Sequence, residues 1–103
     1  MFNVKRNEPV ICKDGFKMSV QASRDSYCEP RINNAPIYTK VEVGFPSSSE
    51  SLLHPYFDGD VEAGNPCNGV YAYVPVNIVT LVIAKHGGMV SGEVPRGIPH
   101  LPA

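Results

Sequence analysis

The chain has 103 residues, of which 43% are hydrophobic and 18% charged. This length and apolar content suit a single domain with a hydrophobic core and argue against wholesale disorder. Nine basic and ten acidic residues leave a net charge of −1. Proteins that bind long nucleic acids usually carry a basic excess or a basic stripe, so we expect no direct binding to extended DNA or RNA.

Neither a secretion signal nor a membrane span is expected. The first nine residues hold no apolar segment long enough for a signal peptide, and the most apolar run, 74–84, is interrupted by Pro75, Asn77 and Thr80. Three cysteines fit a reducing compartment better than a disulfide framework, although one disulfide with a spare thiol is an alternative. We therefore expect a cytoplasmic protein with no membrane partner.

The first half of the chain predicts a hairpin and a further strand. After a leader over residues 1–8, apolar residues at 9–12 and an alternating run at 16–22 flank the turn signal Lys13-Asp14-Gly15. Residues 23–36 are polar and proline-containing, which predicts a long loop. The alternation over 37–45 predicts the clearest strand of the chain, which ends at Pro46.

The second half predicts one more strand and the helix. A short helical turn is expected from Ser47 up to His54-Pro55, followed by a surface loop over 58–69. Residues 70–74 form a compact apolar strand pattern, and apolar residues at helical spacing run from Pro75 to Lys85-His86. Gly87-Gly88 supplies the C-terminal cap, and residues 91–103 are expected to be a flexible, proline-rich tail.

These elements predict an α+β fold in one domain over residues 1–103. We expect a small antiparallel sheet of about four strands, packed by one C-terminal helix. The ten prolines and nine glycines argue against an all-helical bundle. The helix pattern is apolar on nearly every side, so we expect it to pack deeply across a sheet face.

The loop over residues 23–31 carries the densest set of functional side chains. Arg24 and Arg31 could grip a phosphate or carboxylate, because a guanidinium group binds such anions bidentately. Tyr27 lies between them and could stack on a base. The alternative is that the arginines only form solvated pairs with Asp25 and Glu29 that tie the loop down.

Other chemistry is less well supported by the spacing. A nucleophilic cysteine would need a nearby base, and Cys28 with His86 is the pair considered; His54 and His100 are the other histidines. Zinc would need Cys12, Cys28, Cys67 and a histidine, but no CxxC or HxxxH spacing occurs. Asp58, Asp60 and Glu62 lack the further ligands of a calcium loop. We expect no metal, no cofactor and no catalytic residue.

Several short motifs occur in a familiar order. They are residues 10–16 (VICKDGF), 18–23 (MSVQAS), 27–31 (YCEPR), 41–46 (VEVGFP) and 73–88. Together they resemble a family of small, largely uncharacterised accessory proteins of tailed bacteriophages and prophages. The resemblance covers roughly residues 10–88 and implies a phage protein that acts in the cytoplasm of the bacterial host.

This resemblance, together with the lack of a catalytic motif, leads us to expect an anti-defence protein that works by binding. It would either sequester a signalling nucleotide through Arg24, Tyr27 and Arg31, or inhibit an immune complex such as a CRISPR effector. The inhibitor would present an acidic and tyrosine surface made of Asp58, Asp60, Glu62, Tyr71 and Tyr73. A virion structural or assembly protein, and a small enzyme built on Cys28 and His86, are the alternatives.

A homo-oligomer is also expected. One apolar helix on a small sheet leaves the second sheet face without a cover, and such faces commonly pair between copies. The candidates for lining that face are Tyr38, Tyr71 and Tyr73.

Overall fold

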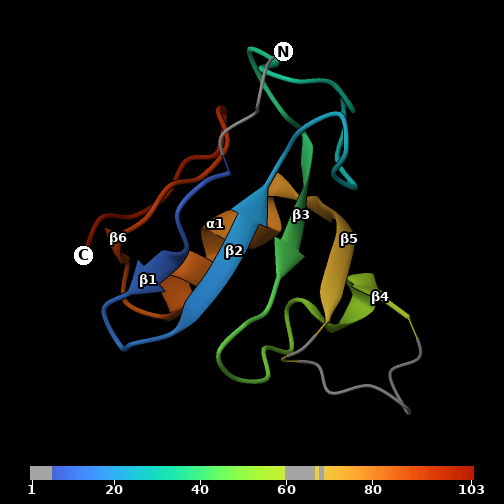
Figure 1. Ribbon diagram of the computed structural model, residues 1–103. Helices are drawn as coiled ribbons and strands as arrows, with labels where there is room; N and C mark the ends of the chain where they lie inside the picture. Colours follow the sequence, from blue (N-terminus) through green and yellow to red (C-terminus); the bar gives the residue numbers. More distant parts are fainter. Residues whose placement is uncertain (1–5, 60–66, 68) are drawn as a thin grey trace.

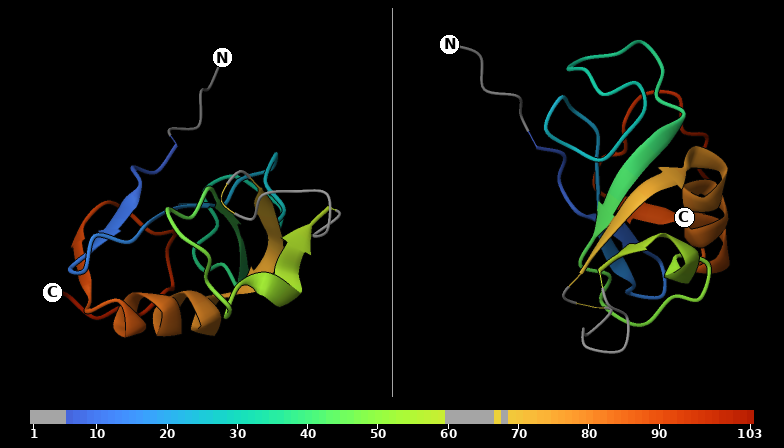
Figure 2. Two further views of the ribbon diagram at one scale, coloured as in Figure 1. Left: turned by 90° about the horizontal axis from the view of Figure 1, so that it is seen from below. Right: turned by 90° about the vertical axis from the view of Figure 1, so that its right-hand side faces the viewer.

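The computed structural model describes residues 6–59, 67 and 69–103. The described elements form an α+β fold, in which helix α1 (Val76–Lys85) crosses one face of a six-stranded antiparallel sheet (Figure 1, Figure 2). The class and the single helix agree with the prediction, but the sheet has six strands where about four were expected. The two additional strands are short and lie at the two edges.

The sheet has the strand order β4-β5-β3-β2-β1-β6. The bounds are β1 Val10–Cys12, β2 Lys17–Gln21, β3 Lys40–Gly44, β4 Phe57–Asp58, β5 Val70–Pro75 and β6 Met89–Ser91. The predicted hairpin is confirmed, because β1 and β2 pair with Val10 opposite Met18. Its turn is closed by Asp14, whose Oδ1 accepts the Phe16 amide at 2.9 Å.

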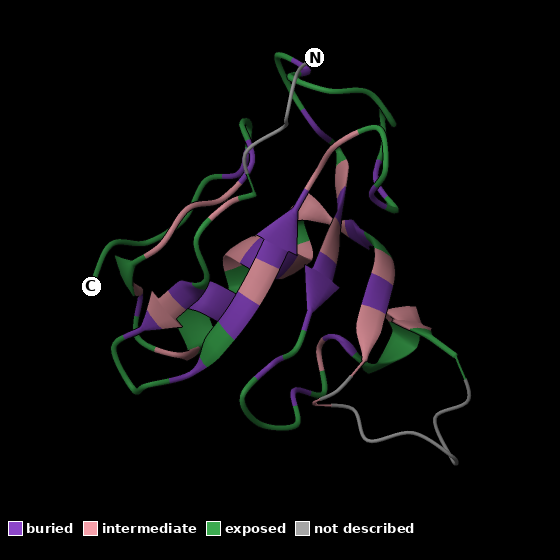
Figure 3. Cartoon of the chain, viewed as in Figure 1, coloured by how far each residue is buried: buried purple, intermediate pink, exposed green. Residues whose placement is uncertain are grey.

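The core lies between the sheet and α1. Met18 and Val20 of β2 and Val43 of β3 are buried in this core. Figure 3 shows that buried positions recur along both strands. The helix contributes Val79, Val82 and Ile83 to the same cluster. Burying an aliphatic side chain of this size stabilises a fold by roughly 1.5–3 kcal/mol, so these contacts are what hold helix and sheet together.

The helix begins and ends close to where the sequence predicts. Pro75 caps it at φ −57°, and the chain leaves it through Gly87 and Gly88, both with φ above 90°. The Gly88 amide donates to the Ile83 carbonyl at 2.9 Å, as expected of a glycine-terminated helix. Only one face is buried, however, since Leu81 is 50% exposed, so the helix covers the sheet without being enclosed.

The segment 91–103, expected to be a flexible tail, instead packs against the domain. Ser91 belongs to β6, which pairs with β1, and Ile98 is 6% exposed. Met89 exchanges backbone hydrogen bonds with Leu101 and Ala103 at 2.8 and 3.1 Å. The prolines correctly indicated an irregular backbone. The packing was missed because β6 pairs with β1, which is far away in the sequence, and no local pattern records such a pairing.

The expected helical turn before Pro55 is also corrected. Residues 51–53 form turns, and the helical part is the 3-10 helix η1, His54–Tyr56, which contains Pro55. Proline is tolerated here because the first residues of such a helix have no amide partner to lose.

Parts of two predicted segments lie outside the described residues. These are residues 1–5 of the leader and residues 60–66 and 68 of the surface loop. Within the described part of the chain, no helix is long and apolar enough to cross a membrane.

Candidate functional site

The loop over residues 23–36 is attached to the sheet where β3 and β5 lie side by side (Figure 1). The Tyr27 amide donates to Glu42 Oε2 at 3.0 Å, and the Tyr27 carbonyl accepts the Tyr73 amide at 3.1 Å. Glu29 pairs with Lys40 through a backbone hydrogen bond of 3.0 Å. The backbone around Tyr27 is therefore held by both β3 and β5.

Hydrogen bonds within the loop hold its two arginines at a set spacing. Arg31 Nε donates to the Arg24 carbonyl at 2.9 Å, and the Arg24 amide donates to Asn33 Oδ1 at 2.8 Å. Beneath them, Ser26 and Cys28 are buried, and the Cys28 thiol donates to the Ser23 carbonyl at 3.1 Å. These bonds fix the shape of the loop through contacts within the chain.

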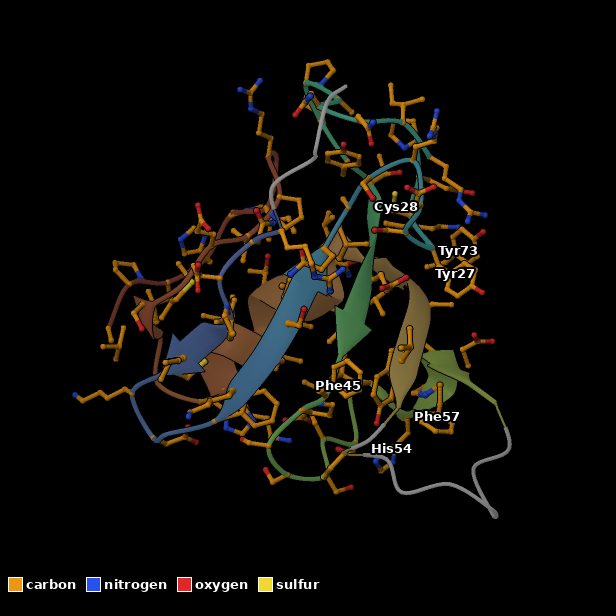
Figure 4. All side chains as sticks on the ribbon, viewed as in Figure 1. Tyr27, Cys28, Phe45, His54, Phe57 and Tyr73 are labelled. Carbon is orange, nitrogen blue, oxygen red and sulfur yellow. The ribbon has the colours of Figure 1, made fainter. Side chains whose placement is uncertain are left out.

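Tyr27 lies close to both Arg31 and Tyr73, and the Arg31 side chain contacts the backbone of Arg24. We call these four residues the Arg–Tyr cluster: Arg24, Tyr27, Arg31 and Tyr73. The Arg31 guanidinium lies 5.4 Å from the Tyr27 ring centroid, within cation–π range. The Tyr27 and Tyr73 rings are 6.0 Å apart and tilted by 43° (Figure 4). The two tyrosines are 38% and 39% exposed, so their rings remain accessible to a ligand.

The two arginines of the cluster make few ion pairs with the described residues. Arg24 is 75% exposed and meets only the edge of Asp25, at 4.0 Å. In the described part of the chain, Arg31 makes no ion pair, and Glu29 is paired with Lys40 at 3.5 Å instead. The alternative interpretation, in which both arginines serve as ion-pair tethers, therefore fits Arg24 only weakly and does not fit Arg31.

Tyr71, predicted beside Tyr73 in a binding surface, points into the core instead. It is 0% exposed and packs edge-on against Phe57 at 5.2 Å, and burial raises the pKa of its phenol. The cause is a β-bulge in β5. Val41 pairs with Val74 and Val43 with Tyr71, so β5 has one residue more than β3 over this stretch. Tyr73 lies within the bulge and has a φ of 52°, and this backbone conformation turns its side chain outward.

Tyr38, suggested for an oligomer surface, is also buried. It is 4% exposed, and its hydroxyl donates to the Ile32 carbonyl at 2.7 Å and accepts the Ala35 amide at 3.1 Å. Of the three tyrosines expected to line the second sheet face, only Tyr73 is therefore exposed. The oligomer remains a prediction, but it cannot use Tyr38 or Tyr71.

The Cys28–His86 pair is not formed. Cys28 lies near the start of α1. Its neighbour Glu29 accepts the Thr39 amide, and the Thr39 carbonyl accepts the amide of Val76, the first residue of the helix. His86 follows the other end of this ten-residue helix, about 15 Å away at 1.5 Å per residue. Burial also raises the pKa of the Cys28 thiol, which disfavours the nucleophilic thiolate.

The metal alternatives gain no support from the geometry. Within the described residues no three histidine, cysteine or acidic side chains converge as ligands. Cys12 lies in β1 while Cys28 lies in the distant loop. Asp60 and Glu62, weighed for calcium and for an acidic docking surface, lie outside the described residues.

His86 is the centre of a second polar cluster that the sequence analysis missed. Its Nδ1 lies 2.6 Å from Asp14 Oδ2, and its Nε2 lies 2.6 Å from Glu50 Oε1. Lys85 Nζ completes the group at 2.8 Å from Glu50 Oε2, and the imidazole stacks on Phe16 at 4.0 Å. We call these five residues the His86 cluster.

No local pattern would have revealed this cluster. Its members come from the hairpin turn, a serine-rich loop and the end of α1, up to 72 positions apart. The sequence suggests His86 as a base for Cys28 or as a residue that suits the C-terminal end of a helix, and neither interpretation accounts for the two carboxylates.

The chain matches no protein-family model, and no curated protein or solved structure is significantly similar to it.

Proposed function

We propose that this protein is a non-enzymatic binding protein that captures a small anionic ligand with a planar ring, such as a signalling nucleotide. The observation that supports this proposal is the Arg–Tyr cluster, in which two exposed arginines and two partly exposed tyrosines lie on one hydrogen-bonded loop and the adjoining strand.

The chemistry of the cluster suits a nucleotide. Guanidinium groups bind phosphate through paired N–H donors. Among the described residues, Arg31 donates only its Nε, to the Arg24 carbonyl, so its terminal nitrogens could serve a ligand. Stacking of a base on an aromatic side chain contributes about 1–3 kcal/mol. The two rings are only 6.0 Å apart, whereas a base inserted between two rings needs about 7 Å. A base therefore stacks on the outer side of the pair.

The size of the ligand follows from charge. A polymer would need a basic path along the surface. Here Asp25 lies 4.0 Å from Arg24, Glu42 accepts the Tyr27 amide, and the whole chain carries a net charge of −1. The proposal is therefore limited to a small molecule.

The biological setting rests on the motif resemblance. A phage accessory protein that binds a signalling nucleotide in the bacterial cytoplasm would lower its free concentration and so counter a nucleotide-activated defence. The direct-inhibitor version is disfavoured, because Tyr71 is buried and therefore absent from the surface that this version requires.

The proposal is tested by calorimetric titration with a nucleoside monophosphate, a cyclic dinucleotide, inorganic phosphate and single-stranded DNA. We expect one of the two nucleotides to bind, with phosphate and DNA at least tenfold weaker. Arg24→Ala/Arg31→Ala should weaken that binding by at least about 100-fold, since the two arginines together would contribute roughly 3 kcal/mol or more through charge-assisted hydrogen bonds.

Arg96→Ala is the matched control, because Arg96 is an exposed arginine outside the cluster. It should bind as the wild type does. Equal affinity of the double variant and the wild type, or no binding of either nucleotide, would refute the proposal. Recovery of the protein with purified phage particles, in place of a small molecule, would favour the virion alternative.

A further inference from the structure

The His86 cluster joins three segments that are far apart in the chain. Asp14 lies in the β1–β2 turn, Glu50 in the loop after β3, and Lys85 and His86 at the C-terminal end of α1. The Asp14 amide also donates to the His86 carbonyl at 3.2 Å. The hairpin turn and the loop therefore meet through one imidazole ring.

Both ring nitrogens of His86 face carboxylate oxygens at 2.6 Å. A neutral imidazole has one N–H, so it donates to one carboxylate and turns a lone pair toward the other. The imidazolium donates at both nitrogens and carries the charge that both carboxylates require. Only a ring with a proton on each nitrogen can donate to both carboxylates at once.

The contact with Glu50 matters for stability, because the Glu50 side chain is only 1% exposed and depends on protein donors to satisfy its charge. Besides His86 it accepts hydrogen bonds from Lys85 at 2.8 Å and from the Leu52 amide at 3.0 Å. A buried carboxylate that loses a charged donor is costly to keep, since water cannot replace the missing bond without the loop moving.

The charged surroundings of the ring come from all three segments. Within the described part of the chain, the charged groups that face the cluster are Asp14 and the nearby Lys13 from the hairpin turn, Glu50 from the loop and Lys85 from the helix. Next to the ring lies a pocket of about 250 Å³, lined by Asp14, Gly15, Phe16, Ser47, Ser48 and His86.

We infer that His86 is a protonation-dependent latch, which holds the serine-rich loop and the hairpin turn against the end of α1 while the ring is charged and releases them when it loses its proton. The latch is independent of the Arg–Tyr cluster and of what that cluster binds.

The test is amide hydrogen exchange of the full chain between pH 6 and 8.5, expressed as protection factors. The reporting amides are those of Asp14, Phe16 and Leu52, whose hydrogen bonds belong to the cluster or its turn. The amides of Val20 and Val43, in paired central strands, provide the reference. We expect the reporting amides to lose at least tenfold protection as the pH rises, while the reference amides keep theirs.

His86→Gln removes the switch, because an amide side chain cannot donate at both ends. In this variant the reporting amides should be weakly protected at every pH. His100→Gln is the matched control, since His100 bonds the Ile98 carbonyl and lies outside the cluster, and it should retain the wild-type pH profile.

If His86→Gln does not fold, the wild-type and His100→Gln profiles alone decide the matter. Protection that does not change with pH in the wild type, or the same pH-dependent loss in His86→Gln, would overturn the inference.

Discussion

Tyr73 shows how one residue in an unusual backbone conformation brings two exposed tyrosine rings together. Strand alternation places residues 71 and 73 on the same side of a strand. The bulge in β5 breaks this alternation, so that Tyr71 fills the core and Tyr73 stacks beside Tyr27. A bulky residue at φ 52° is strained by roughly 1–2 kcal/mol. The contacts of β5 with β3 and with the loop must compensate for that strain.

Tyr73→Asn separates the role of the ring from that of the backbone. Asparagine accepts a positive φ more readily than tyrosine, so the bulge should persist and the free energy of unfolding should change by less than about 1 kcal/mol. Nucleotide affinity should fall about tenfold, because one stacking ring is lost. Urea unfolding and calorimetric titration check the two expectations. Tyr73→Phe, which keeps the ring, is the control and should bind nearly as the wild type does.

Glu42 has a positioning role within the same site. Its carboxylate accepts the Tyr27 amide at 3.0 Å from the middle of β3, so it connects the loop to the sheet through the backbone of the loop. In the sequence it is simply the polar partner in an alternating strand. Its role depends on which loop crosses that face, and the strand pattern does not contain this information.

Among the elements, β6 and the segment after it depend on a close backbone approach. Gly92 has φ +105°, and a Cβ built on it would lie 2.1 Å from the Pro9 carbonyl oxygen. The neighbouring Glu93 amide donates to the Glu8 carbonyl at 3.2 Å. Only glycine allows the chain to pass this closely beside the residues that precede β1.

Gly92→Ala should therefore destabilise the protein by about 2 kcal/mol in urea unfolding, through backbone strain and the displacement of β6. Gly15→Ala is the matched control. Gly15 has a similar φ of +95°, but a Cβ at this position would meet no atom within 4 Å, so this variant reports the conformational strain alone. Equal losses for the two variants would show that the approach to Pro9 does not matter.

At the scale of the whole molecule, Glu50 links stability to acid pH. Burial alone would raise the pKa of this carboxyl, but Lys85, the Leu52 amide and His86 together hold it below its usual value. A carboxyl whose pKa is lower folded than unfolded stabilises the fold above the unfolded value of about 4.3. That contribution is lost as the pH falls through the lower, folded value.

Urea unfolding between pH 7 and pH 3 tests this link. The wild type should lose stability below about pH 4.5, and Glu50→Gln should lose less over the same range because its side chain does not titrate. At pH 7 the variant should already be less stable by about 2 kcal/mol, a figure that allows for solvent screening of the half-exposed Lys85. Asp25→Asn, at an exposed site, should follow the wild type. An unchanged acid response in Glu50→Gln would contradict the assignment.

Elements whose signals are local could be predicted from the amino-acid order. Alternation located β2 and β3, and a compact apolar run located β5. Asp14-Gly15 located the hairpin turn, and apolar spacing with Gly87-Gly88 bounded α1. The sequence also indicated three of the four members of the Arg–Tyr cluster, which lie close together in one loop, and it named Tyr73 as a partner-binding residue. These features follow from periodicity, turn chemistry and composition, all of which can be recognised within a short stretch of neighbouring residues.

The remaining features became visible only in the folded chain. Folding paired β6 with β1 and packed the proline-rich end, placed Tyr71 inside and Tyr73 outside through a bulge, and separated Cys28 from His86 by the length of a helix. It also brought Asp14, Glu50 and Lys85 together around the imidazole. One cause accounts for all of these differences. Contacts between segments distant in the chain depend on how whole elements pack, and no short stretch of sequence records that arrangement.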